Sequence, residues 1–331
     1  MNQKIKFIGL VISLLFLIVM NLKSGSIELS FQEMLDLKSS GKDFIFYNLR
    51  APKTLLALFS GAGLALSGLY MQSVFRNPLA GPYVLGISSG SSLGVALVVL
   101  GASFLGAPLL LSNPWTISIA AFIGAFFILG MVMLASRWIK DTLSILIIGL
   151  MMGSFSAAII SLLSFYAPAE SLKKYILWGM GNLHAVPWEL VHFVWISVLI
   201  GLFIGLFHLK SLNAFILGDQ AAESLGISFK KGRNSLFIAT SLMTGCISAA
   251  AGPIAFLGLA MPHIARILFK TSDHKVLIPA SALLGANCLL FCDLLASLPG
   301  QSGLLPINSM TSLIGAPIVI YLMLKKNKLI L

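Results

Sequence analysis

One stretch of the sequence matches the pattern of a catalytic nucleophile. Gly86-Ile87-Ser88-Ser89-Gly90 fits G-x-S-x-G, in which a strained turn exposes a reactive serine. That chemistry needs a preceding strand, followed along the chain by an acid and then a histidine. Here the candidates His263 and Asp293 come in the opposite order, and the flanks are long apolar segments. We therefore interpret the serines as a glycine-rich helix start and expect no catalytic residue.

Asp293 is the one carboxylate deep inside an apolar segment. An ionisable residue in such a place suggests a function by default, here the coupling of transport to a proton or an ion. The alternative is a structural hydrogen bond near the external end of its helix, where Ser297 and Pro299 follow. We favour the structural role because the acid has no cation within the apolar segments. His263, directly after Pro262, is interpreted as a polar group that satisfies a helix kink or anchors a helix end.

Cys288 and Cys292 are four residues apart, a spacing that puts both thiols on one helix face. No histidine stands near them, and Asp293 is the only acid close by, so buried apolar packing is favoured over a metal site. The sequence has no Walker A motif and no H-E-x-x-H motif. We expect no metal or cofactor on this chain and no ATP hydrolysis by it.

The composition places these residues in a membrane. The chain has 331 residues, of which 58% are hydrophobic and only 10% are charged. A soluble domain has about 25% charged residues, so this chain cannot cover a water-facing surface. Residues 77–136, 142–169 and 234–265 contain no Asp, Glu, Lys or Arg. Runs of that length satisfy the need for about 20 apolar residues per helical span. The net charge of +11 comes without a basic stripe carrying interleaved aromatics, so we expect no nucleic-acid partner.

Breaks at Pro, Gly and charged residues divide the chain into about ten spans. With both termini in the cytoplasm, fifteen of the 22 Lys and Arg residues fall inside and seven outside, as the positive-inside rule requires. The sequence therefore predicts an all-α, polytopic transmembrane bundle that forms a single domain over residues 1–331. The expected spans are residues 7–20, 54–75, 88–101, 115–135, 142–165, 188–207 and 234–250, a shorter one ending at 268 after a break at Gly252-Pro253, and then 276–296 and 308–324.

Residues 212–229 form a polar stretch between two of these spans. Gly218 can end a helix, Asp219 can cap a new one, and Gly226 can stop it after one or two turns. Basic residues flank the stretch on both sides. An ordinary connecting loop is the plain alternative, but the pattern also suits a short helix that docks on a soluble cytoplasmic partner.

Arg50 and Lys53 lie at the external start of the second span. They can be interfacial cations whose charged ends reach the water. They can also pair with acids on an external partner, because such charge pairs set orientation and association rate.

Motifs from Arg50 to Pro317 occur in an order that is specific to one family. They are Arg50-Ala51-Pro52-Lys53, residues 60–68, Gln72, residues 76–82, Leu85-Gly86-Ile87, Leu217-Gly218-Asp219, Ala221-Ala222, Leu225-Gly226, residues 252–259, residues 262–266, Gly285-Ala286, Asp293 and Gly315-Ala316-Pro317. The chain resembles the permease subunits of iron-chelate (siderophore or haem) and vitamin B12 importers, the FecCD type among the type II ABC importers.

The resemblance implies a homodimer around a central pathway in a bacterial cytoplasmic (inner) membrane. It implies two cytosolic ATPase subunits, which bind ATP and Mg, and an external substrate-binding protein that meets Arg50 and Lys53. The residues it assigns to ATPase coupling are Leu217, Gly218, Asp219, Ala221, Ala222, Glu223, Leu225 and Gly226. Pathway or hinge candidates are Gln72, Asn77, Pro78, Gly252, Pro253, Pro262, His263 and Asp293.

Two departures from the family pattern concern the outer face. Ser297 stands about where the family often has an arginine, and residues 304–308 replace an acidic residue before proline-valine-glycine. A ferric siderophore is the first choice of cargo, with haem and cobalamin next. The alternative function is a secondary transporter driven by an ion gradient, with Asp293 as its coupling acid.

Overall fold

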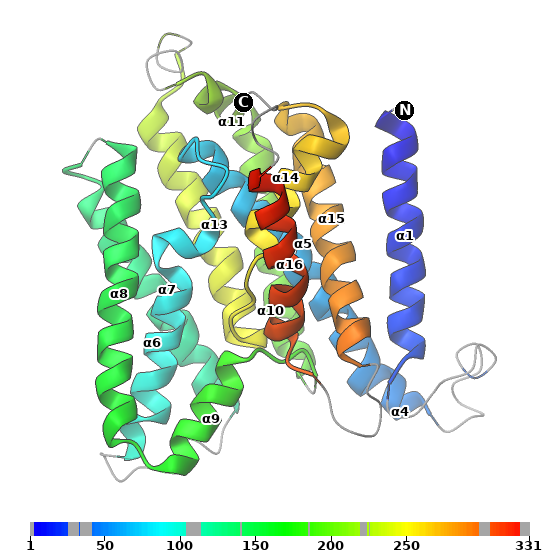
Figure 1. Ribbon diagram of the computed structural model, residues 1–331, viewed down its shortest axis with the longest axis vertical. Helices are drawn as coiled ribbons and strands as arrows, with labels where there is room; N and C mark the ends of the chain where they lie inside the picture. Colours follow the sequence, from blue (N-terminus) through cyan, green and yellow to red (C-terminus); the bar gives the residue numbers. More distant parts are fainter. Residues whose placement is uncertain are drawn as a thin grey trace.

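Every element in the described part of the chain is a helix (Figure 1). The computed structural model describes residues 3–25, 33, 42–103, 114–139, 141–184, 186–218, 224, 226–297 and 305–324. The elements are α1 (Gln3–Lys23), α4 (Asp43–Ile45), η1 (Phe46–Arg50), α5 (Ala51–Val74), η2 (Pro82–Leu85), α6 (Ile87–Val99), η3 (Gly101–Ser103), α7 (Pro114–Ala135), α8 (Thr142–Tyr166), α9 (Ala169–Gly179), α10 (Trp188–Phe207), α11 (Leu209–Leu217), α13 (Phe229–Ala251), α14 (Leu257–Phe269), α15 (His274–Ala296) and α16 (Ile307–Leu324).

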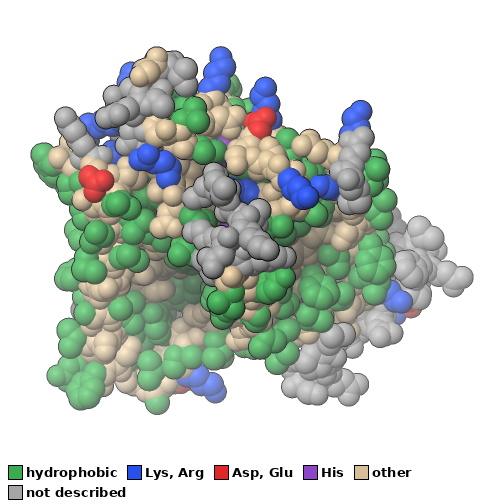
Figure 2. All heavy atoms as spheres, turned by 45° about the horizontal axis from the view of Figure 1, so that its top comes forward, with side chains coloured by type: hydrophobic (Ala, Val, Ile, Leu, Met, Phe, Trp, Pro, Cys, Tyr) green, Lys and Arg blue, Asp and Glu red, His purple; other side chains and the backbone are tan. Residues whose placement is uncertain are grey.

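The predicted all-α membrane bundle is confirmed. Seven helices of the described residues are long and apolar enough to cross a membrane, and α6, α14 and α16 supply three shorter apolar helices. The start of α1 and the end of α16 lie at the same end of the bundle (Figure 1). Lys and Arg side chains gather around that end, while hydrophobic side chains cover the flanks (Figure 2). By the positive-inside rule this end is cytoplasmic.

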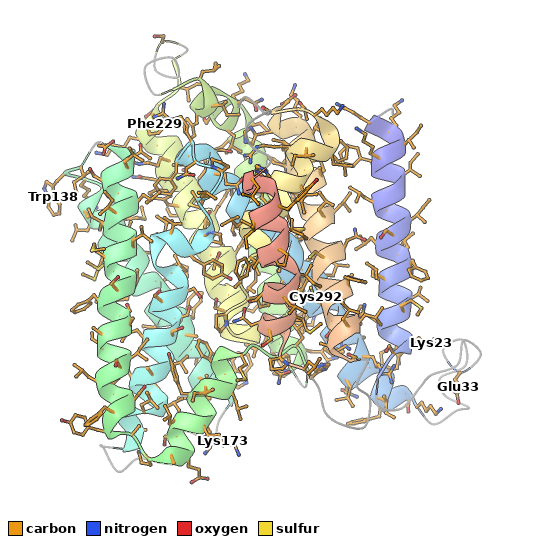
Figure 3. All side chains as sticks on the ribbon, in the orientation of Figure 1. Lys23, Glu33, Trp138, Lys173, Phe229 and Cys292 are labelled. Carbon is orange, nitrogen blue, oxygen red and sulfur yellow. The ribbon has the colours of Figure 1, made fainter. Side chains whose placement is uncertain are left out.

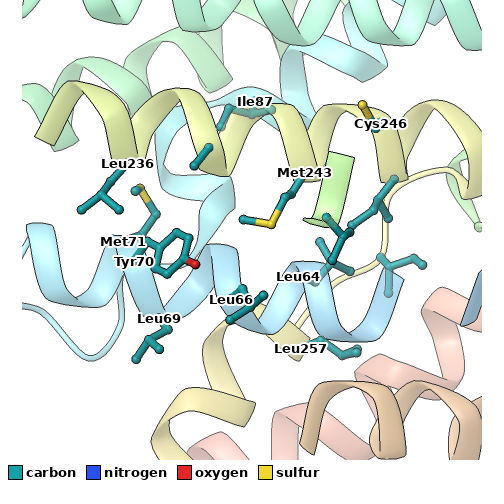
Figure 4. Close-up of a cluster of buried hydrophobic side chains, with 14 of the residues drawn as sticks. Leu64, Leu66, Leu69, Tyr70, Met71, Ile87, Leu236, Met243, Cys246 and Leu257 are labelled. Carbon is teal, nitrogen blue, oxygen red and sulfur yellow. The ribbon is translucent and has the colours of Figure 1, made fainter. Parts of the chain in front are cut away.

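Helix α5 is the centre of the bundle. In the continuous helix Asp43–Val74, which includes α5, 78% of the residues in the 18-residue apolar stretch are buried. For α1, at the edge, the same fraction is 11%. Leu64, Tyr70 and Met71 of α5 lie in a core cluster that also contains Leu236 and Met243 of α13 (Figure 4). Removing so much of α5 from lipid fixes it as the helix against which the others are positioned.

Helix α15 makes the most extensive contact with α5, and two glycines make this possible. A Cβ built on Gly61 would lie 2.3 Å from the carbonyl oxygen of Gly285, and one on Gly285 would lie 2.2 Å from the oxygen of Gly61. The two backbones therefore touch at mid-height. Such close approach is how membrane helices gain dispersion contacts where lipid removes the hydrophobic drive between them.

The break predicted at Gly252-Pro253 is present. Helix α13 ends at Ala251, and α14 begins only at Leu257. Gly252 has φ +76°, which a residue with a side chain rarely adopts, and a Cβ there would lie 2.6 Å from the Trp178 carbonyl oxygen. The backbone of this unwound segment finds partners outside it: the Ala255 N–H donates to Asn308 Oδ1 at 3.0 Å.

The predicted spans 142–165 and 188–207 had no helix between them, and that prediction was wrong. Residues 169–179 form helix α9, which follows Pro168 as its N-cap. Its Tyr175 and Trp178 rings stack with centroids 6.4 Å apart and pack with Val95 and Val99 of α6. Its polar face carries Lys173, which lies at the same end of the molecule as Lys23, opposite Trp138 and Phe229 (Figure 3). Turn residues at 179–182 suggested a loop, but an apolar face separated from the lysines determines the helix.

Candidate functional site

The external ends of α5 and α15 are joined by a buried ion pair. Lys53 Nζ of α5 lies 2.9 Å from Asp293 Oδ2 of α15, and their side chains are 6% and 1% exposed. The expectation that Asp293 has no cation nearby was wrong, because Lys53 is buried beside it. Two opposite charges held together out of water are costly to separate, since either one alone would be left uncompensated.

Two further side chains surround this pair. Ser297 Oγ lies 3.5 Å from Lys53 Nζ and donates to the Asp293 carbonyl oxygen at 2.9 Å. His184 Nε2, from the connection between α9 and α10, lies 3.8 Å from Asp293 Oδ1. Burial lowers the pKa of His184, and the charge of Lys53 lowers it further, against an opposing effect of Asp293. Near neutral pH the imidazole is therefore uncharged, and Lys53 supplies the charge that balances Asp293.

A cavity of about 300 Å³ opens beside Asp293. It is lined by His184 and Asp293 together with residues at the start of α16, including Pro306 and Ile307. The four polar side chains at this end come from α5, from α15 with its C-cap Ser297, and from the α9–α10 connection. Any movement of these elements against each other must therefore rearrange charged contacts.

Arg50 lies near the same end and is also buried, at 5% exposure. Its Nη1 donates to the carbonyl oxygen of Leu22 at 2.9 Å, in the last turn of α1. A guanidinium is well suited to this place because the carbonyls at a helix C-terminus lack partners within the helix. Both Arg50 and Lys53 thus have partners within this chain. Their docking on an external binding protein stays a prediction.

At the cytoplasmic end, Gln72 joins α5 to α14. Its Nε2 donates to the Leu259 carbonyl oxygen at 3.0 Å, and its Oε1 accepts from Arg266. Asn77 lies in the turn that follows α5, where its Oδ1 accepts from the Leu79 N–H at 2.9 Å. Of the predicted hinge residues, Gln72, Asn77 and Pro78 lie together around a small cavity of about 90 Å³, which Arg266 also lines.

A second set of bonds at this end centres on His274, which sequence reasoning missed. Its Nε2 lies 2.6 Å from Ser73 Oγ of α5, and its Nδ1 lies 2.7 Å from Asn213 Oδ1 of α11. Asn213 Oδ1 also accepts from the His274 backbone N–H, and Asn213 Nδ2 donates to Asp273 Oδ1. The His274 backbone N–H fixes Asn213 Oδ1 as an acceptor, so His274 Nδ1 carries the proton. Ser73 Oγ also donates to the Leu69 carbonyl oxygen at 2.8 Å, so its single hydrogen is shared between that oxygen and His274 Nε2.

This second set ties three elements together without a charge pair between helices. Ser73 belongs to α5, His274 to α15 and Asn213 to α11, and the first two side chains are almost completely buried. The signal available in the sequence was a histidine and an asparagine at the cytoplasmic ends of apolar segments. Nothing in it indicated that they meet, because 61 residues separate the pair.

The predicted ATPase-coupling stretch begins next to these residues. Helix α11 ends at Leu217, directly before Gly218, and the Leu217 side chain is 67% exposed. Ile216 lines the same small cavity as Gln72 and Asn77, and the Arg76 guanidinium would lie 3.2 Å from a Cβ on Gly218. Gly226, at the other end of the stretch, has φ +74°. The remaining coupling candidates, Asp219, Ala221, Ala222, Glu223 and Leu225, lie outside the described residues.

The other hinge candidates do not join either cluster. Gly252 and Pro253 form the unwound segment between α13 and α14, and Pro262 is buried inside α14. His263, next to it, is partly buried. The predicted hinge residues thus do not form one cluster. Gly252 lies against Trp178 and Gly181, and Gly181 lines the cavity beside Asp293.

Comparison with known proteins gives a consistent result over nearly the whole chain. The model of the FecCD transport family matches residues 13–325. The haemin transport system permease protein HmuU of Yersinia pestis is 33% identical over 96% of this chain and 95% of its own. The vitamin B12 import system permease protein BtuC of Klebsiella pneumoniae is 35% identical over 96% and 93%.

Solved structures agree with these relatives. A chain described as an inward-facing conformation of a metal-chelate type ABC transporter superposes with a TM-score of 0.86 at 30% identity, covering 98% of this chain and 100% of that one. A chain of PsaBC from Streptococcus pneumoniae, in complex with Fab, has a TM-score of 0.57 at 16% identity, which shows a shared fold alone.

Proposed function

This chain belongs to the FecCD transport family, and we propose that it is the membrane-spanning permease of an ATP-driven importer whose cargo is a ferric siderophore. In this proposal two copies of the chain surround a pathway across a bacterial cytoplasmic membrane. Two cytosolic ATPase subunits and an external binding protein complete the transporter. ATP and Mg bind to the ATPase partners, and the chain itself holds no cofactor.

The observation that carries the proposal is the setting of the coupling stretch. Its first residues leave α11 beside Arg76, and Asn213 of the same helix is bonded to the first residue of α15. His274 continues this contact to Ser73 of α5. A displacement of the segment after Leu217 would therefore be transmitted through α11 and these hydrogen bonds to α15 and α5.

Transport then follows from two arrangements of one bundle. ATP binding favours one arrangement of the cytoplasmic end, and its hydrolysis favours the other, so the pathway opens alternately to the two sides. The permease contributes no bond making or breaking. Haemin and vitamin B12, named for the relatives, are the alternative cargoes.

The test is uptake into proteoliposomes that contain this chain, its ATPase and its binding protein. Ferric siderophore, haemin and cobalamin are offered separately, with and without ATP inside. We expect ATP-dependent accumulation of ferric siderophore. Uptake that ignores ATP and follows a proton or sodium gradient would contradict the proposal and support the ion-coupled role of Asp293.

A second test addresses the coupling stretch. Replacing Asp219 or Leu225 by alanine is expected to leave the complex folded while ATP hydrolysis no longer drives uptake. Lys231→Ala, an exposed residue of α13, is the control and should transport normally. Unchanged uptake in both coupling variants would exclude this segment as the ATPase contact.

A further inference from the structure

The serine-rich segment that resembles a nucleophile motif lines a cavity that the proposed mechanism leaves unused. The cavity has a volume of about 430 Å³ and lies between η2, α6, α8 and α9. Six of its lining side chains carry a hydroxyl group, and none of the described residues that line it is charged. The hydroxyl-bearing residues are Tyr83, Ser88, Ser89, Ser92, Ser161 and Tyr175.

Helix geometry explains why these groups meet. Ser88 and Ser92 are four residues apart on α6 and so share a face, with Ser89 beside them. Gly153 and Ala157 of α8 are also four residues apart, and these small residues leave the space open. A Cβ on Gly153 would lie only 3.3 Å from Ser89 Oγ, so the cavity narrows at that level.

Part of the hydrogen-bonding capacity of this wall is unused. Tyr175 bonds to Ser92 across the α6–α9 contact. The Tyr83 hydroxyl oxygen is buried and has no hydrogen-bond partner among the described residues. A buried polar group without a partner costs free energy, and a tyrosine hydroxyl usually has one. An unpaired hydroxyl in this cavity does not stabilise the packing of the helices. The presence of such a group therefore points to a polar ligand that binds there.

The chemistry of the wall restricts that ligand. Hydroxyl groups both donate and accept, so they suit amide, hydroxamate and hydroxyl oxygens. An ionised carboxylate buried there would lack a cation, and an unpaired buried charge costs far more than an unpaired dipole. The cavity lies in the range of small-molecule sites but is small for a whole chelate, so it fits one edge of a larger cargo.

We propose that this hydroxyl-lined cavity is a cargo-binding subsite that selects uncharged, oxygen-rich chelates. The inference rests on the proposed function and narrows it: neutral ferric trihydroxamates and corrinoids fit the wall, whereas haem, with two propionates, does not. Ser89 and Ser92 supply hydrogen bonds to the cargo edge, and Ala157 leaves room for it.

The experiment measures initial uptake rates in the reconstituted complex with a neutral ferric trihydroxamate, cyanocobalamin and haemin. Ser89→Ala and Ser92→Ala remove one hydroxyl each, and Ala157→Phe fills the cavity. For the neutral cargo that wild type carries, each serine variant should raise KM about threefold to tenfold with little change in the maximum rate. Ala157→Phe should reduce kcat/KM by more than about tenfold.

The control is Ser154→Ala on α8, an exposed serine that bonds only to its own helix, at the Leu150 carbonyl oxygen. It should match wild type. Wild-type values of KM in all three cavity variants would overturn the inference while leaving the importer intact. Transport of haemin alone would also overturn it. No ATP-driven uptake of any cargo by wild type would instead contradict the proposed function, and the inference would fall with it.

Discussion

The two ends of the α5–α15 pair are held in opposite ways. At the external end Lys53 and Asp293 form a buried ion pair at 2.9 Å. At the cytoplasmic end Ser73 and His274 form a hydrogen bond at 2.6 Å in which the imidazole is neutral, and Asn213 extends it to α11. Between these ends Gly61 and Gly285 bring the two backbones into contact.

The difference determines which end can rearrange cheaply. Breaking one neutral hydrogen bond costs about 1 kcal/mol when water or another group replaces it. Parting a buried ion pair leaves two uncompensated charges and costs several kcal/mol. The cytoplasmic end is therefore suited to small, repeated changes passed on from α11. The ion pair makes the external end more resistant to separation. For Lys53 and Asp293 to part, water or a partner protein must compensate the two charges.

The largest expected effect is at the external ion pair. Asp293→Ala leaves the Lys53 ammonium buried without its partner, so we expect a loss of about 3–5 kcal/mol in the free energy of unfolding. Thermal or chemical unfolding of the detergent-solubilised protein measures this loss. Glu189→Ala removes an exposed acid from the external end of α10 and should stay within about 0.5 kcal/mol of wild type.

A double variant separates a structural ion pair from an ion-coupling acid. Lys53→Met combined with Asp293→Leu replaces the pair by apolar groups, which is often nearly neutral for stability. We expect this variant to fold and to keep ATP-driven uptake. A well-folded double variant that transports nothing would favour a coupling role for Asp293.

The next largest effect is expected where the backbones of α5 and α15 touch, between the two ends of the helix pair. Gly285→Val places a branched side chain where even a Cβ would lie 2.2 Å from the Gly61 carbonyl oxygen. The helices must move apart, so we expect a loss of about 1–3 kcal/mol or more. The measurement is the unfolding midpoint in detergent. Gly130→Val on α7, where a Cβ meets no atom within 4 Å, is the matched control. Equal midpoints for the two variants would refute the tight α5–α15 contact.

A smaller effect is expected at the cytoplasmic network. Asn213→Ala leaves the His274 Nδ1–H and backbone N–H without their partner and removes one of the two donors to Asp273 Oδ1, a loss of about 1–3 kcal/mol. ATP hydrolysis should continue while uptake per ATP falls, because α11 loses its bond to α15. Asn48→Ala, which removes an exposed asparagine bonded only to Phe44, should change neither quantity. A normal ratio of uptake to hydrolysis in Asn213→Ala would show that coupling takes another route.

The smallest effect is a pH dependence at the same network. The hydrogen bond from the Lys275 N–H and then that from Asn213 lower the pKa of Asp273. A lowered pKa in the folded state stabilises the fold above the ordinary aspartate value of about 4, and this gain disappears as the pH falls through the lowered value. Between about pH 5 and 3 the unfolding midpoint of wild type should therefore fall slightly more than that of Asp273→Asn. Parallel curves would contradict this assignment.

The sequence predicted most of the frame on which this comparison depends. The spans of α5 and α15 followed from long apolar runs bounded by charged residues and helix breakers, and the break at Gly252-Pro253 followed from two residues that do not continue a helix. The end of α11 before Gly218 followed in the same way. These features are local, so the residues within one or two turns determine them.

The pairing of side chains across the bundle could not be read in this way. Lys53 and Asp293 are 240 residues apart, and the ordered spans placed both only at the same side of the membrane. Apolar spacing does not say which helix packs on which, so the contacts of His274 with Ser73 and Asn213 were missed. Helix α9 was missed because turn residues follow it closely.

The unwound segment between α13 and α14 also bears on how the chain is made. The Ala255 N–H has its acceptor on Asn308, at the start of α16, and the Asn308 N–H donates to Met180. During synthesis α13 and α14 leave the ribosome before Asn308 exists. The hydrogen bond that completes this break therefore forms only after Asn308 has been translated, and a chain truncated before α16 leaves the Ala255 N–H without this acceptor.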